Sequence, residues 1–221
     1  MSQAAKRFVA IAGNIGVGKS TLTGLLAQRL GWQPFYEAVD DNPYLADFYA
    51  DMSAWSFHSQ VFFLSRRLYH HRQILDFPQS AVQDRSVYED AEIFAANLFH
   101  QGRMSKRDYA TYQALYDSIN RFLPPPDLLV YLRASVETLQ KRITMRGRSY
   151  EQALDPAYLA QLNTLYEAWI EHFTLCPVLT VPADELDFVW HGPHLELIIQ
   201  KIEERLSGKE TVRFDEWQLR Q

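Results

Sequence analysis

The sequence predicts an α/β fold in which a five-stranded parallel sheet is flanked by helices. Short apolar runs alternate along the chain with longer segments whose apolar residues recur at helical spacing. This alternation is typical of parallel sheets, because each crossover between parallel strands needs a helix to cover the sheet. The chain has 221 residues, 47% of them hydrophobic, and no evident linker, so we expect one domain over residues 1–221.

The first half of the chain supplies three of the strands. An apolar run that ends in glycine predicts a strand at 7–13, and leucines at helical spacing predict a helix at 19–31. A second short strand is expected around 32–36. An aromatic-rich helical region is expected from about 42 to 77, and "SAVQD" at 80–84 is interpreted as the third strand.

The second half repeats the pattern. Three prolines form a rigid turn into a fourth strand within 124–134, and "PVLTV" at 177–181 is the fifth. The polar tail at 207–221 is predicted to be flexible. The remaining helices are expected at 88–101, 105–122, 135–146, 156–173 and 194–206.

Charge and hydropathy exclude several classes of function. The formal charge of -5 argues against binding polymeric nucleic acid, which normally requires a basic surface. No run reaches the roughly 20 apolar residues of a membrane span, and the first residues lack a secretion signal. We therefore expect a cytoplasmic protein with small-molecule ligands.

The segment "GNIGVGKS" matches the pattern G-x-x-x-x-G-K-[ST] between a predicted strand and a predicted helix. Its glycines allow backbone N–H groups to surround phosphate oxygens, and the helix start adds partial positive charge. Lys19 can reach the terminal phosphates, and the Ser20 hydroxyl can bind Mg²⁺. A nucleoside triphosphate is therefore expected at Gly13, Asn14, Ile15, Gly16, Val17, Gly18, Lys19, Ser20 and Thr21.

Two carboxylates and an arginine follow neighbouring predicted strands. Glu37 comes just after the second strand, and Asp84 and Arg85 end the third. One carboxylate could assist the metal while the other accepts a proton from an attacking hydroxyl. The spacing alone does not say which does which, and an ordinary solvated helix start would also explain "DRSVYED".

The chain resembles the deoxyribonucleoside kinases, especially the bacterial deoxyadenosine and deoxyguanosine kinases. The resemblance rests on "GNIGVGKS", Glu37, "WSFHSQ" (55–60), "DRSVYED" and "RITMRGRSYEQ" (142–152), in that order. It runs from about residue 8 to about 190. It implies a P-loop kinase fold with a helical lid, ATP as phosphate donor, Mg²⁺ as cofactor, and a homodimer. The implied reaction transfers the terminal phosphate of ATP to the 5′-hydroxyl of a deoxynucleoside.

The resemblance assigns the residues around the transferred phosphate. Glu37 is expected to take the proton of the 5′-hydroxyl, and Arg85 to hold Glu37 and the phosphoryl region. Asp84 and Ser20 are expected to organise Mg²⁺ through water. Animal members carry glutamate where this chain has Asp84, so the directness of the metal contact is in doubt.

Gln60 and Arg67 lie seven residues apart on a predicted helix, so they project from nearly the same face. The Gln amide has one donor and one acceptor, as the adenine edge requires. The resemblance pairs Arg67 with Asp90 at the base, although a polar stripe on a half-buried helix would also explain the spacing. It places Tyr49 and Glu151 at the sugar 3′-hydroxyl, in a pocket without room for a 2′-hydroxyl.

Three arginines in "RITMRGR" are expected to form the lid. Arg142 and Arg146 share a helix face, and Gly147 permits a break that brings Arg148 over the phosphates. Guanidinium groups would counter the charge on the transferred group. A basic helix end that stabilises its own dipole is the alternative. Arg66 and Glu89 are expected at the surface.

Two broader alternatives stay open. The chain could be another P-loop small-molecule kinase, or a silent structural relative, although intact Lys19, Glu37, Asp84 and Arg85 argue against the second. The preferred deoxynucleoside is also open. A Gln, Arg and Asp pocket can hydrogen-bond deoxyadenosine, deoxyguanosine and deoxycytidine, so a purine is the first expectation and deoxycytidine or a broad specificity the alternative.

Overall fold

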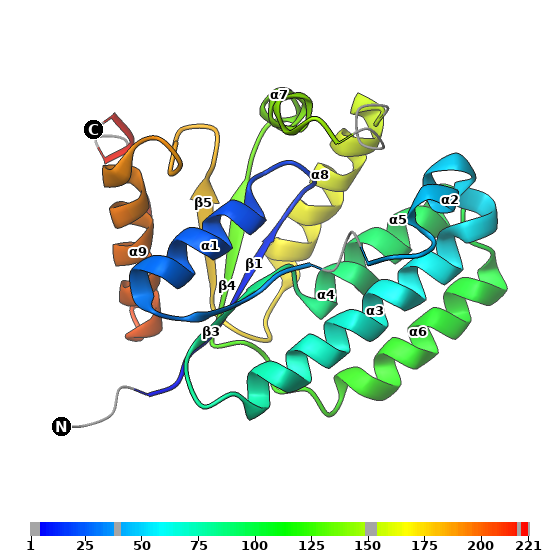
Figure 1. Cartoon of the computed structure of the whole chain (residues 1–221), viewed down its shortest axis with the longest axis horizontal. Coiled ribbons are helices and arrows are strands. Elements are labelled where there is room, and N and C mark those ends of the chain that lie inside the picture. The colour runs from blue at the N-terminus through cyan, green and yellow to red at the C-terminus, as the bar shows by residue number, and fades with distance from the viewer. Residues whose placement is uncertain (1–4, 38–40, 149–153, 216–217, 221) are drawn as a thin grey trace.

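The structure is a computed structural model that describes residues 5–37, 41–148, 154–215 and 218–220. Its centre is a five-stranded parallel sheet in the order β2-β3-β1-β4-β5, which confirms the predicted α/β fold class (Figure 1). The strands are β1 (Phe8–Gly13), β2 (Gln33–Phe35), β3 (Ala81–Asp84), β4 (Leu128–Arg133) and β5 (Val178–Pro182).

Helices cover both faces of the sheet, and every residue of β1 is therefore buried. Val9 and Ile11 face one layer, where α1 (Lys19–Leu30) and α9 (Gly192–Leu206) pack against the sheet. Ala10 and Ala12 face the opposite layer, where α8 (Pro156–His172) packs. Strands buried on both faces read as continuous apolar runs, which is why the sequence revealed them.

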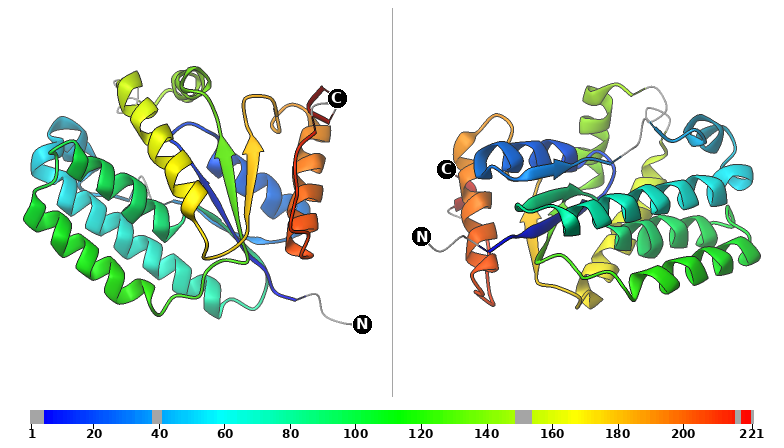
Figure 2. Two further views of the ribbon diagram at one scale, coloured as in Figure 1. Left: turned by 180° about the vertical axis from the view of Figure 1, so that it is seen from behind. Right: turned by 60° about the horizontal axis from the view of Figure 1, so that its bottom comes forward.

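A group of helices lies to one side of the sheet and has a hydrophobic cluster of its own (Figures 1 and 2). This side group carries Gln60 and Asp90, which line the cavity beyond the carboxyl ends of the strands. It consists of α2 (Leu45–Ala50), α3 (Met52–Asp76), α4 (Val87–Glu89), the π-helix η1 (Asp90–Ala95), α5 (Ala96–His100) and α6 (Lys106–Asn120). The helix α7 (Val136–Arg146) lies beyond the carboxyl end of β4, and η2 (Gln218–Arg220) is a short 3₁₀ helix near the end of the chain.

Three details differ from the sequence prediction. The helical region expected over 42–77 is interrupted at Asp51, whose carboxylate accepts hydrogen bonds from Ser53 N and Ala54 N and starts a new helix. The helix expected over 88–101 contains the π turn of η1, a feature found mostly at functional sites. In the tail predicted to be flexible, Val212 and Leu219 pack against the core.

The strand order places β1 at the centre, between β3 and β4. Connections run from β1 toward β2 on one side, and from β4 toward β5 on the other. Ligands of open parallel sheets bind beyond the carboxyl ends of the strands at such a switch point. Among the described residues, no helix combines the length and the apolar character that crossing a membrane would require.

Candidate active site

A cavity of about 940 Å³ opens beyond the carboxyl ends of the strands. It runs from the loop after β1 to α2, α3 and η1 on one side, and to α7 and residues 184–190 on the other. Most of the predicted site residues line it: Ile15, Gly16, Gly18, Lys19, Ser20, Thr21, Glu37, Tyr49, Gln60, Asp84, Arg85, Asp90, Arg142, Arg146 and Arg148. Glu151, predicted at the sugar, lies outside the described residues.

The loop from Gly13 to Ser20 has backbone conformations that side chains disfavour. Gly16 has φ +83°, and a Cβ there would lie 2.6 Å from Cγ1 of Ile143 on α7. Gly13 has φ +142°, and its Cβ would lie 2.7 Å from the carbonyl oxygen of Leu132. The two glycines therefore permit a tight loop packed against both the sheet and the lid helix.

Not every loop residue directs its side chain toward the cavity. The Asn14 side chain is buried and donates to the carbonyl of Leu159 and to Asn163 Oδ1 on α8. Val17 is fully buried in the core. Asn14 and Val17 can therefore serve a phosphate only through their backbone groups, while their side chains fix the loop.

Lys19 is the buried cation of the loop. Its ammonium donates to the carbonyls of Gly13, at 2.9 Å, and Asn14, at 3.0 Å. Burial, with a contribution from Arg85, lowers the pKa of Lys19 to about 8. An incoming phosphate would counter both effects, so this ammonium is poised to bind negative charge.

Glu37 lies between two arginines at the centre of the cavity. Its Oε1 accepts a hydrogen bond from Arg67 Nη2 at 2.9 Å. Arg85 Nε lies 2.8 Å from the same oxygen, without hydrogen-bond geometry. Burial opposes ionisation, but Arg85 and Arg67 outweigh it and lower the pKa of Glu37 to about 2. The group is therefore a carboxylate at every ordinary pH.

Asp84 ends β3 directly beside the phosphate loop. Its Oδ2 accepts a hydrogen bond from the Ser20 hydroxyl at 2.5 Å, whereas its Oδ1 is buried and has no hydrogen-bond partner. Burial raises the pKa of Asp84, although Lys19 opposes the shift. A carboxylate oxygen without a hydrogen-bond partner, next to a hydroxyl, is a set of ligand atoms suited to Mg²⁺. This ion binds one or two protein oxygens besides phosphate and water.

Arg85 reaches the site from a strained backbone. Its φ is +68°, the left-handed region that residues other than glycine rarely adopt, and its N–H donates to the Ile11 carbonyl of β1. The guanidinium lies 4.2 Å above the ring of Phe94. This conformation aims the side chain across the cavity toward Glu37.

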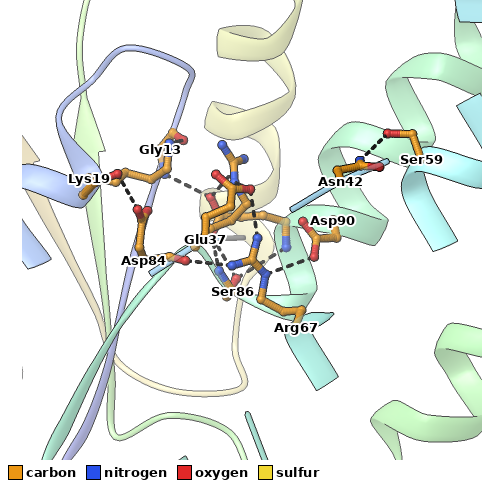
Figure 3. Close-up of polar contacts among 12 residues, drawn as sticks. Gly13, Lys19, Glu37, Asn42, Ser59, Arg67, Asp84, Ser86 and Asp90 are labelled. Carbon is orange, nitrogen blue, oxygen red and sulfur yellow. Dashed lines mark hydrogen bonds and ion pairs between the residues drawn. The ribbon is translucent and has the colours of Figure 1, made fainter. Parts of the chain in front are cut away.

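The far end of the cavity is polar and buried. Arg67 Nε donates to Asp90 Oδ2 at 3.1 Å, and Arg67 Nη1 donates to the carbonyl of Asp84 at 2.8 Å (Figure 3). Gln60, on the same face of α3, is 4% exposed, and its Oε1 has no hydrogen-bond partner. The predicted pairing of Arg67 with Asp90 is thus present, and Gln60 offers an unused acceptor beside it.

The lid helix α7 ends where the sequence indicated. It ends at Arg146, and Gly147 caps it with φ +74°. Arg142 donates to the carbonyls of Val17 and Ala183, both at 2.7 Å, so it fastens the lid helix to the phosphate loop. Arg146 and Arg148 line the cavity beyond it.

Glu89 was expected at the surface, and that expectation is wrong. Its side chain has no exposed area, because its carboxylate accepts from the backbone N–H groups of Gly13 and Ser86. Ser86 and Glu89 form a capping box at the start of α4, so the S-x-x-E spacing was a signal that could have revealed it. Tyr166 of α8 also contacts this carboxylate, and no local pattern indicated that residue. Arg66 is 40% exposed, in agreement with its expected surface position.

The strand, glycine loop, lysine and lid arginines around one cavity define a P-loop kinase. A family model described as deoxynucleoside kinase matches residues 9–207, and the chain belongs to that family. It is therefore an ATP-dependent phosphotransferase.

Individual relatives match most of the chain. The deoxyadenosine/deoxycytidine kinase of Bacillus subtilis is 42% identical over 196 residues, which cover 88% of this chain and 90% of the relative. A deoxyguanosine kinase of Lactobacillus johnsonii is 38% identical over 219 residues, covering 95% and 96%. The structure of deoxyadenosine kinase from M. mycoides with bound dATP has a TM-score of 0.79 at 31% identity and covers 89% of this chain and 99% of that one.

Proposed function

We propose that this chain transfers the terminal phosphate of ATP to the 5′-hydroxyl of a deoxyribonucleoside and prefers a purine. The single observation that carries the proposal is the buried, unpartnered Gln60 Oε1 beside the Arg67–Asp90 pair. An unsatisfied buried acceptor is costly, and a ligand that donates to it restores the lost hydrogen bond. The adenine amino group is such a donor, and the Gln60 amide group can donate to the adjacent ring nitrogen in return.

Glu37 is proposed to orient the 5′-hydroxyl and to accept its proton. It lines the same cavity as the phosphate loop and is held between Arg67 and Arg85, where a carboxylate can orient a hydroxyl for in-line attack. Arg85 would bridge the carboxylate and the transferred group, because its guanidinium already contacts Glu37. Arg146 and Arg148 would counter charge from the lid side. The Arg142 guanidinium donates to the backbone carbonyls of Val17 and Ala183, so its part is to hold the lid helix against the phosphate loop.

Mg²⁺ fits the residues that border the loop. Ser20 Oγ and the free Oδ1 of Asp84 would hold it, directly or through water. When bound, the ion neutralises charge on the phosphate oxygens. Asp84 is less suited to take the 5′-hydroxyl proton, since it is committed to Ser20 beneath the loop.

The sugar position follows from the two ends of the cavity. Tyr49 of α2 lines the same cavity as Gln60, and its hydroxyl is proposed to contact the sugar. A nucleoside that spans from Gln60 to Glu37 would place its ribose edge there, and close packing would discriminate against a 2′-hydroxyl. Glu151 is the proposed acidic partner of Tyr49.

A homodimer is also proposed, because large exposed apolar side chains lie on α3, on α6 and just after α6. Tyr69 is 55% exposed, Leu115 40%, and Phe122, just after α6, 82%. Large exposed apolar residues of this kind often mark association surfaces. Light scattering after size-exclusion chromatography is expected to give twice the chain mass, and Phe122→Asp is expected to shift it toward the monomer. A cytoplasmic location remains a prediction from the sequence.

A phosphorylation panel tests the proposed reaction. The four deoxynucleosides and adenosine are each incubated with the enzyme, ATP and magnesium, and the 5′-monophosphates are quantified. Deoxyadenosine or deoxyguanosine is expected to give the highest kcat/KM. Deoxycytidine is expected to be a further substrate, because the similar B. subtilis enzyme is a deoxyadenosine/deoxycytidine kinase. Thymidine as the best substrate would refute the Arg67 and Asp90 argument. Comparable activity on adenosine would refute the selection of deoxyribose.

A further inference from the structure

Glu89 is a fully buried carboxylate to which the proposed reaction gives no role. Its Oε1 accepts hydrogen bonds from Gly13 N at 3.1 Å and from the Tyr166 hydroxyl at 2.8 Å. Its Oε2 accepts from the backbone N–H of Ser86 at 2.7 Å and from the Ser86 hydroxyl at 3.0 Å. A buried charge persists only when its acceptor sites are satisfied in this way.

These contacts join the start of the phosphate loop to the segment that follows β3. Gly13 is the last residue of β1 and begins the phosphate loop, whereas Ser86 follows Arg85 at the end of β3. Arg85 Nη1 lies 3.9 Å from Glu89 Oε1 and also donates to the Tyr166 hydroxyl at 3.2 Å. Glu89 and Tyr166 therefore set the distance between the donor-phosphate loop and the arginine at the acceptor.

The Tyr166 hydroxyl has one proton and two acceptors in reach. It lies 2.8 Å from Glu89 Oε1 and 2.9 Å from the carbonyl of Gly13. That carbonyl already accepts from Lys19 at 2.9 Å. When Lys19 turns its ammonium toward a phosphate, the carbonyl loses a donor, and the tyrosine proton can replace it.

We propose that Glu89 and Tyr166 are positioning residues that hold the phosphate loop in place relative to Arg85 and support ATP binding when Lys19 leaves the Gly13 carbonyl. Glu89 fixes the Gly13 peptide relative to Arg85, and Tyr166 moves its hydrogen bond from Glu89 to the Gly13 carbonyl as Lys19 leaves it. Neither residue touches the reacting atoms. The inference rests on the proposed roles of Lys19 and Arg85 at the transferred phosphate.

Tyr166→Phe tests this support of ATP binding, since it removes only the hydroxyl. The KM for ATP is expected to rise about 5- to 10-fold, the effect of one hydrogen bond to a polar or charged group, while the KM for the deoxynucleoside stays within twofold. Tyr131→Phe is the matched control. Tyr131 stacks on Tyr166, and its hydroxyl donates to Glu167 outside the cavity, so both KM values are expected to match wild type.

A double-mutant cycle separates coupling from loss of structure. ATP binding is measured by calorimetry for wild type, Lys19→Ala, Tyr166→Phe and the double variant. The proposal predicts that Tyr166→Phe weakens ATP binding in the wild-type background and has less than a twofold effect when Lys19 is absent. Equal effects in both backgrounds, or an unchanged KM for ATP in the folded single variant, would overturn it.

Glu89→Gln provides a second variant. An amide has one carbonyl oxygen for four donors, so two of the present hydrogen bonds must break, and kcat is expected to fall at least 10-fold in the protein that folds. Glu92→Gln, an exposed neighbour in η1, is expected to behave as wild type. If Lys19→Ala retained full turnover, the proposed function would fail. If Lys19→Ala were inactive while Tyr166→Phe and Glu89→Gln matched wild type, this inference alone would fail.

Discussion

Replacing Glu37 with glutamine tests the general-base assignment with the least change in shape. The pKa of about 2 places Glu37 roughly five pH units below neutrality, so protonating it at pH 7 costs about 7 kcal/mol at 1.36 kcal/mol per unit. Such a carboxylate is always ionised but is a weak base. Its contribution therefore belongs at the lower end of general-base effects, and kcat is expected to fall about 10²-fold.

The assay is steady-state turnover from pH 4.5 to 9 with saturating ATP and deoxynucleoside. Wild-type kcat is expected to show no acid limb from Glu37 in this range, because the group titrates near pH 2. ATP binding to Glu37→Gln, measured by calorimetry, is expected to stay within about twofold of wild type, since the direct partners of Glu37 are Arg67 and Arg85 and not groups of the phosphate loop. Glu92→Gln serves as the control for removal of one negative charge.

Two results would refute this reasoning. Turnover within threefold of wild type would transfer the base assignment to Asp84. An acid limb near pH 5 that disappears in Glu37→Gln would show that Arg67 and Arg85 do not depress the pKa of this carboxyl as its contacts require.

The remaining predictions concern three other groups. Gln60→Leu is expected to raise the KM for deoxyadenosine about 10-fold or more with little change in the KM for ATP, which kinetics with each substrate varied would show. Asp84→Asn is expected to raise the magnesium concentration needed for half-maximal rate at least 10-fold, and an unchanged magnesium titration would exclude Asp84 from the metal site. Burial and Arg85 lower the pKa of Lys19 to about 8, so its charge is present below that pH and is lost above it. ATP binding is therefore expected to weaken from pH 8 to 9.5 and to take up protons near pH 8, as calorimetry in buffers of different ionisation enthalpy would detect.

The fold was predictable where burial produces a recognisable pattern of apolar residues in the sequence. β1 and β4 are largely buried and appear as apolar runs, whereas β3 is equally buried but ends in Gln83 and Asp84. The phosphate loop requires glycine at Gly13 and Gly16 because a Cβ there would collide with neighbouring atoms. The break at Asp51 and the π turn of η1 were missed because a single N-cap or one extra residue per turn barely alters helical periodicity.

The site was predictable from motifs only in part. The positions of Glu37, Asp84 and Arg85 follow from the predicted strand ends, whereas the Arg67–Asp90 pair was implied by the resemblance to the kinase family. Burial of Glu89 did not, because a charged residue in a polar segment resembles a solvated helix start unless its capping partner is considered. The bond from Tyr166 to the carbonyl of Gly13 joins residues 153 positions apart, a contact that only the packed fold can bring about.

The most direct test of the central claim is a crystal structure of the enzyme with deoxyadenosine and a non-hydrolysable ATP analogue. The proposed arrangement predicts the adenine amino group on Gln60 Oε1 and the 5′-oxygen within about 3 Å of a Glu37 carboxylate oxygen, in line with the terminal phosphate held by Lys19. A 5′-oxygen bound to Asp84, with the base away from Gln60, would contradict it.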